Sequence, residues 1–352
     1  MSETITPAAP PVVVTEKKKR EFIGYIHNFR GFAIISVVAG HLLMEWPEDS
    51  IIHQFIRVFW ENGTVLFMFM AGYLFHHLSA NFKYKTYLVS KLKFVVLPYL
   101  LLSIPILAYR LYSGDIPGYL LAYKPDFMAL SGWEKFGFLY VTGGHMQQFW
   151  FIPMIVIFYL LAPVFLYINR HPVWYWIILP LMVLSMYIGR DPFSDIPRMF
   201  VHFLPCYIFG MFMSYKRADY LLFAQKYWWL ITGATLLVLG LNFALFPVAN
   251  TQLNFLHKML FCPFFIYWFW KLDKKVPAML STLAHLSFGI FFVHYYVLLV
   301  LKAVYEKLMK QPIPGNLLYW TIYLVLVLAG SMLVIKAAQK LFGKNSKYLV
   351  GC

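Results

Sequence analysis

The sequence predicts an all-α polytopic membrane protein, a single bundle of about ten transmembrane helices. Hydrophobic residues make up 61% of the 352 residues, and the mean hydropathy is +0.65, whereas soluble domains are about 45–50% apolar. The apolar residues are gathered into stretches of about 17–23 residues, a length that crosses a hydrocarbon layer about 30 Å thick. Aromatic residues make up 20% of the chain, as expected for the belts at the two membrane interfaces.

Ten apolar segments are long enough to cross the membrane as helices. Several of them contain a proline, which predicts a kink at a point where neighbouring helices satisfy the freed backbone groups. The ten segments are residues 25–45, 62–78, 87–109, 147–168, 173–189, 198–214, 228–246, 254–270, 281–301 and 317–336.

Lysine and arginine are distributed unevenly between the two sides of these segments. When the N-terminus is placed in the cytoplasm, the cytoplasmic segments hold roughly twice as many Lys and Arg residues as the outer loops, in agreement with the positive-inside rule. Both termini are therefore expected in the cytoplasm. The net charge of +15 is therefore concentrated on the cytoplasmic side of the membrane. This distribution indicates contact with membrane lipids and not with nucleic acid.

The chain is expected to have three regions. Residues 1–21 are predicted to form a disordered basic cytoplasmic tail, residues 22–342 the transmembrane domain, and residues 343–352 a short cytoplasmic tail. The longest outer loop, at about 110–146, has two open interpretations. It is either a lid or acceptor platform over the outer mouth of the bundle, or a passive connector.

Arg30 and His41 stand out in the first apolar segment. An arginine at the centre of a membrane helix costs about 2.5–3.5 kcal/mol, so a charged residue there indicates a functional site. Eleven residues at about 100° per residue return to within about 20° of the starting direction. In a continuous helix the two side chains therefore share one face, about 16 Å apart along the axis.

The two residue types suit two ends of one site. In the expected orientation Arg30 lies toward the cytoplasm, where its planar guanidinium suits phosphate groups. His41 lies in the outer half, where an imidazole can take a proton from a hydroxyl near neutral pH. Each residue also has a structural interpretation: Arg30 as a snorkelling interfacial side chain, and His41 as a group bonded to a neighbouring helix. Their alignment favours the shared site.

Other polar residues carry weaker signals. Glu45 follows His41 by four residues and would orient its imidazole on a helical face, but the adjacent acidic loop favours a solvated carboxylate. His202, His257 and Lys258 lie near outer helix ends, where we expect contact with lipid headgroups. The histidines have no metal-ligand spacing, so no metal is expected.

Five segments taken together resemble the acyltransferase-3 family of integral membrane acyltransferases. The spacing of Arg30 and His41 matches its Arg-x10-His signature. Phe67–Phe75 resembles its second-helix segment, with alanine where serine is usual. Gln148–Pro153, Phe203–Gly210 and Leu286–His294 resemble three later segments in the same order.

The resemblance implies transfer of an acyl group, usually acetyl from acetyl-CoA, to a hydroxyl of a cell-envelope glycan. By this resemblance, His41 has the role of the essential histidine, as general base or transient acyl carrier, and Arg30 is its partner. The donor phosphates are expected near Arg30, Lys83 and Lys91. The acceptor is expected to be a lipid-linked or nascent glycan, and the location the bacterial cytoplasmic (inner) membrane.

The same resemblance assigns further positions. Tyr73 and Trp150 would shape the acyl channel or simply pack as aromatic side chains. His294, in the middle of a late span, is expected as a second site residue because a polar group there needs a partner. Gly72 would let two helices approach closely.

One alternative from a different class stays open at this point. Ten spans with polar residues near the midplane also suit a transporter or export factor for a polysaccharide or an acyl group. The sequence shows no paired intramembrane carboxylates for ion coupling, which favours the enzyme.

Overall fold

The computed structural model of the chain describes residues 22–190, 195–248 and 250–352. The predicted tail at residues 1–21 lies outside the described residues. Within the described part the protein is all-α, with one isolated β-bridge between Glu45 and Pro314. The α-helices are α1 (Gly24–Ala39), α2 (Ile51–Trp60), α3 (Thr64–Leu78), α4 (Tyr84–Lys91), α5 (Leu97–Ser113), α6 (Gly118–Tyr123), α7 (Gly132–Thr142), α8 (Phe151–Leu160), α9 (Ala162–Arg170), α10 (Ile178–Ile188), α11 (Ile196–Tyr215), α12 (Arg217–Ala244), α13 (Asn250–Lys271), α14 (Ala278–Met309), α15 (Leu317–Phe342) and α16 (Ser346–Val350).

Six helical stretches of the described chain are long and apolar enough to cross a membrane, and the bent pair α8 and α9 makes a seventh if it is one span. The protein is thus a multi-pass membrane protein. Each of the ten predicted segments contains a helix, but ten spans are not confirmed. The first predicted span is shorter than expected because α1 ends at Ala39 after 16 residues.

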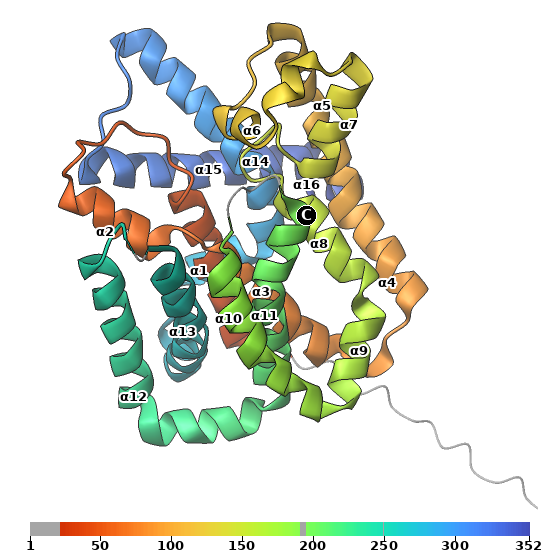
Figure 1. Cartoon of the computed structure of the whole chain (residues 1–352), viewed down its shortest axis with the longest axis vertical. Helices are drawn as coiled ribbons and strands as arrows, with labels where there is room; N and C mark the ends of the chain where they lie inside the picture. The colour runs from red at the N-terminus through yellow and green to blue at the C-terminus, as the bar shows by residue number, and fades with distance from the viewer. Residues whose placement is uncertain (1–21, 191–194, 249) are drawn as a thin grey trace, which may run out of the picture.

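Helices α3 and α11 lie side by side near the centre of the molecule (Figure 1). Two glycines bring their backbones into contact. A Cβ atom added to Gly72 would lie 1.8 Å from the carbonyl oxygen of Tyr207, and one added to Gly210 would lie 1.9 Å from that of Phe69. The close approach expected at Gly72 is therefore present, and it is reciprocal.

Helices α1 and α14 pack against each other in parallel. Residue numbers increase in the same direction along both helices from one contact to the next. His27 Nε2 lies 3.1 Å from the carbonyl oxygen of Ser281, and Arg30 donates to that of Ala284. Gly31 makes this packing possible, because a Cβ there would lie 2.2 Å from the carbonyl oxygen of Leu280.

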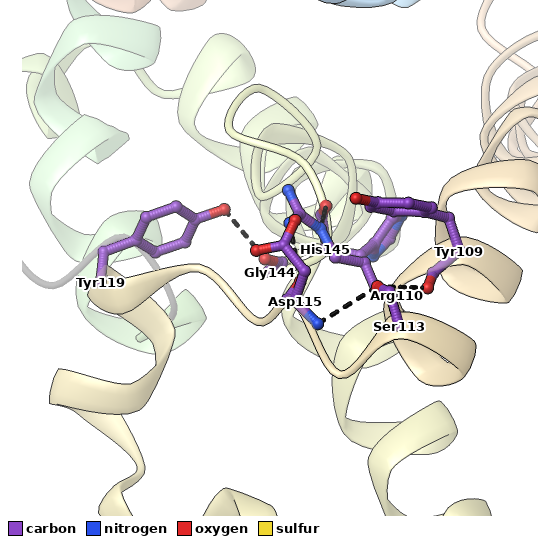
Figure 2. Close-up of polar contacts among 7 residues, drawn as sticks. All are labelled: Tyr109, Arg110, Ser113, Asp115, Tyr119, Gly144 and His145. Atoms are coloured by element: carbon purple, nitrogen blue, oxygen red, sulfur yellow. Dashed lines mark hydrogen bonds and ion pairs between the residues drawn. The ribbon is translucent and has the colours of Figure 1, made fainter.

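Residues 110–146, expected as the longest outer loop, form a folded layer with its own small core. Leu107, Leu120, Phe127 and Leu139 form this core between the end of α5 and helices α6 and α7. An ion pair closes its first end and a hydrogen bond joins its two ends, as Figure 2 shows. Arg110 donates to Asp115 Oδ2 at 2.7 Å, and Tyr119 Oη donates to the carbonyl oxygen of Gly144 at 2.9 Å. The layer therefore fixes the position of Gly144, from which the chain continues into residues 145–150.

The segment predicted as a short C-terminal tail contains α16. This helix packs against α5, α14 and α15, and Val350 is buried. Residues 343–352 therefore contribute to the packing of the bundle.

Candidate active site

His41 lies just beyond the end of α1. The helix ends at Ala39, and the backbone N–H of His41 bonds to the carbonyl oxygen of Val38 in a tight final turn. The expectation of one continuous helix through residue 45 was wrong. His41 nevertheless faces α14, as Arg30 does, because the last turn keeps it on the side of α1 that packs there.

The ring of His41 contacts the ring of His294 from α14. The His41 Nδ1 and His294 Nε2 atoms are 3.2 Å apart, and the two rings stack with centroids 5.2 Å apart. The His294 Nδ1 atom lies 2.9 Å from the carbonyl oxygens of both Ile290 and Phe291. His294 is fully buried and His41 is half-buried, so the structure joins the two histidines in one partly buried pair.

These contacts determine which ring atoms carry protons. Carbonyl oxygens only accept hydrogen bonds, so Nδ1 of His294 is the protonated nitrogen of that ring. Its Nε2 must then accept a hydrogen bond from Nδ1 of His41. In the neutral state, His41 therefore carries its proton on Nδ1 and keeps a lone pair on Nε2.

A cavity of about 340 Å³ adjoins His41. Side chains from four of the five family-like segments line it, although these segments are far apart in the sequence. The lining from these segments comprises Ser36, Val37, Gly40, His41, Phe67, Gln148, Trp150, Phe151, Phe288 and Phe291. The remaining wall is mostly polar and comes mainly from residues 57–64, at the end of α2 and the start of α3.

The polar wall is held by a small network. Arg57 Nε lies 2.8 Å from Glu61 Oε1, and Arg190, which follows α10, donates to Asn62 Oδ1 at 3.3 Å. Asn62 has a φ of 62°, a left-handed conformation that asparagine tolerates better than most residues. The next residue is Gly63, whose added Cβ would lie 3.1 Å from Ser36 Cβ. The wall therefore presses closely on the end of α1.

Arg30 does not line this cavity. Its Nη2 atom donates to the carbonyl oxygen of Ala284 at 2.5 Å, and its buried Nε has no hydrogen-bond partner among the described residues. The structure thus places Arg30 and His41 along the same helix, α14, but only His41 at the cavity.

Of the two residues expected to shape the acyl channel, Trp150 lies at the cavity and Tyr73 does not. Trp150 lines the cavity and stacks on Phe203. Tyr73 is buried away from it, where its Oη lies 3.1 Å from Oη of Tyr25. Trp150 is therefore part of the cavity wall, and Tyr73 belongs to the α1–α3 contact.

The lysines expected near the donor phosphates lie on α4 or just before it. Lys83 is exposed. Lys91 lies over the rings of Tyr87 and Tyr159, 5.3 Å and 5.0 Å from their centroids. These contacts hold Lys91 against α8, whereas Arg30 packs on α14.

Glu45 does not lie beside His41, in agreement with the solvated carboxylate that its acidic loop favoured. Its side chain is exposed, and its backbone bridges to the loop at Pro314. The four-residue spacing would have placed Glu45 above His41 only if α1 had continued. His294 takes the position beside the imidazole instead.

Three further polar residues are buried, contrary to the expected contact with headgroups. His202, His257 and Lys258 are each at most 1% exposed. The Lys258 ammonium donates to the carbonyl oxygen of Phe59 and lies 5.0 Å from the ring centroid of Phe261. Lys258 thus binds the C-terminal end of α2, next to the polar cavity wall.

Sequence reasoning missed most of the polar wall. Arg57 and Arg190 counted only as charges of outer loops, and Glu61, Asn62 and Gln148 carried no catalytic pattern. The one usable signal was Gln148, which opens a family-like segment. The described residues contain no group of three or more His, Cys, Asp or Glu side chains arranged to hold a metal ion.

The family model described as an acyltransferase domain, that of the acyltransferase-3 family, matches residues 23–336. The chain therefore belongs to this family, and it is a membrane acyltransferase. No curated protein and no solved structure matches the chain.

Proposed function

We propose that the protein moves an acyl group, most simply acetyl, from acyl-CoA to a hydroxyl of a cell-envelope glycan. The observation that carries this proposal is the His41–His294 pair at the cavity. His294 fixes the proton of His41 on Nδ1, which leaves the basic Nε2 available to a bound hydroxyl. The family membership supports the acyl transfer itself.

The reaction follows from this arrangement. The acceptor hydroxyl gives its proton to Nε2 of His41 while its oxygen attacks the thioester carbonyl. The carbon–sulfur bond then breaks, the coenzyme A thiolate leaves, and the imidazolium returns the proton to the sulfur. Alternatively, Nε2 takes the acyl group first and passes it to the acceptor. The phenylalanines and Trp150 that line the cavity limit access of water, which would compete as acceptor.

Donor and acceptor enter from opposite sides in this proposal. Arg30 lies toward the N-terminal end of α1, the cytoplasmic end if both termini are inside, and would bind donor phosphates. The exposed Lys83 adds positive charge on the same side. The cavity lies at the other end of α1, where a glycan or lipid-linked sugar would enter in the bacterial inner membrane.

The test is turnover of acetyl-CoA by the purified protein. Wild type should release coenzyme A in an acceptor-dependent manner, and His41→Ala should lower the rate about 10²- to 10⁴-fold while the protein still inserts and purifies normally. A His41→Ala variant with wild-type turnover would overturn the proposal. A wild-type protein that only transports a glycan, without using acetyl-CoA, would identify an export factor instead.

A further inference from the structure

We propose that the cavity beside His41 takes an acceptor that carries an anionic group, a carboxylate or a phosphate, close to its reacting hydroxyl. This inference rests on the proposed function, because it names the chemical class of acceptor for the same site. Three features of the cavity carry it: its charges, an unsatisfied amide oxygen and its size.

The charges of the cavity favour an anion. Its lining includes two arginines, Arg57 and Arg190, and one carboxylate, Glu61. The ammonium of Lys258 lies directly behind this wall, at the end of α2. Cationic groups that outnumber carboxylates in a partly enclosed cavity raise the local concentration and affinity of anionic ligands.

The geometry of Arg57 suits such a ligand. Its ion pair with Glu61 is made through Nε, which leaves its two Nη groups for a second anion. A guanidinium is planar and matches two oxygens of a carboxylate or phosphate. The side chain of Arg57 is 42% exposed, so a ligand can reach it from the surface.

Gln148 adds a requirement for a hydroxyl. Its Oε1 atom is buried and has no hydrogen-bond partner among the described residues, while its Nε2 lies 3.1 Å from Met146 Sδ. A buried amide oxygen without a donor is unfavourable. Gln148 lines the cavity, so a ligand O–H would supply the missing donor once the amide turns toward the cavity. The site thus calls for a hydroxylated acid.

The size of the cavity separates acceptor from donor. A volume of about 340 Å³ is near the lower end for ligand pockets. It suits one sugar unit, whereas the nucleotide part of coenzyme A with its phosphates needs more room. The arginines of this wall are therefore assigned to the acceptor and not to the donor.

The experiment compares three matched acceptors with purified protein and acetyl-CoA: methyl glucuronide, the 6-phosphate of methyl glucoside, and methyl glucoside. We expect a lower KM for at least one acidic glycoside than for the neutral one. Whichever acid is preferred distinguishes a carboxylate from a phosphate. Arg57→Gln and Arg190→Gln should raise the KM for that acid about 10- to 100-fold without changing the KM for acetyl-CoA.

Matched controls separate a charge effect from damage to the fold. Lys302→Gln removes one positive charge from α14, where the lysine pairs with Glu306 away from the cavity, and should leave all three KM values unchanged. The rate with methyl glucoside reports whether each arginine variant is folded.

The inference is overturned if the neutral glycoside is used as well as both acids, or if the arginine variants raise the KM for acetyl-CoA instead. If none of the three is acylated, binding to the His41→Ala protein by calorimetry decides: absent or equal binding of the acids also overturns it. Failure of the proposed function looks different, because wild type would then not consume acetyl-CoA with an envelope glycan fraction as acceptor either.

Discussion

Nδ1 of His41 lies 3.2 Å from Nε2 of His294, although 253 positions separate the two residues in the sequence. Parallel packing of α1 on α14 makes this contact. Two carbonyl oxygens of α14 hold the proton of His294 on its far nitrogen. The backbone of α14 therefore sets the protonation pattern of the His41 side chain, and we regard His294 as a positioning residue.

Replacing His294 tests that role. His294→Leu removes the acceptor for His41 Nδ1–H, so the imidazole loses its fixed tautomer and orientation. We expect the kcat for acetyl transfer to fall about 10²- to 10⁴-fold with little change in the KM for acetyl-CoA. His294→Gln offers a side-chain oxygen at a similar place and should restore part of the rate. Equal losses in both variants would argue for a packing role only.

Arg30 is expected to act on the donor. Arg30→Gln removes a guanidinium at the end of α1 opposite the cavity, and we expect the KM for acetyl-CoA to rise about 10- to 100-fold while the KM for the acceptor stays constant. Lys340→Gln, at an exposed position on α15, removes the same charge as a control. An unchanged KM for acetyl-CoA in Arg30→Gln would assign Arg30 to helix packing through Ala284.

The contact between α3 and α11 predicts a large effect on stability. Gly72→Leu places a side chain where a Cβ alone would meet the carbonyl oxygen of Tyr207 at 1.8 Å, so the helices must separate. We expect loss of folded protein, or a drop in the melting temperature of detergent-solubilised protein of well over 10 °C. Gly233→Ala, in α12, meets nothing within 4 Å and should be neutral or slightly stabilising.

His145, in the loop before α8, predicts a dependence of stability on pH. Burial is the main cause that lowers the pKa of this imidazole to about 4. Above pH 6.5 it is neutral in both the folded and the unfolded state. As the pH falls from 6.5 to 4, only the unfolded chain takes up the proton, so the free energy of unfolding decreases by up to about 3 kcal/mol. Denaturation curves of wild type and His145→Gln should differ in this slope. Parallel pH profiles would exclude the assignment.

Hydropathy and a short motif predicted the class of fold and the central histidine. Apolar stretches of membrane length are a local property, and each of the ten contains a helix. The sequence also predicted that His294 has a polar partner, because a histidine in the middle of an apolar helix needs one. Its contact with His41 itself required knowledge of how α1 and α14 pack.

The polar wall could not be predicted in the same way. Arg57 lies on α2 and Arg190 follows α10, and nothing in their local sequence shows that they meet at one cavity. The error at the end of α1 has a related cause. A helical face was extended past Ala39, where the chain in fact turns and joins the loop at Pro314. Helix ends and long-range pairings depend on tertiary packing, which a single sequence does not specify.

The glycine contact between α3 and α11 also limits how the enzyme can move. The backbones of α3 and α11 touch at Gly72 and Gly210. A shift of one helix along the other would bring side chains against the facing backbone, so we expect the two helices to move as one rigid unit. Phe67, near the start of α3, is thereby a stationary edge of the cavity. We therefore expect any gating that admits an acceptor at other walls of the cavity, such as α2, which carries Arg57 and is tied to its neighbours through Gln54, Asn254 and Lys258.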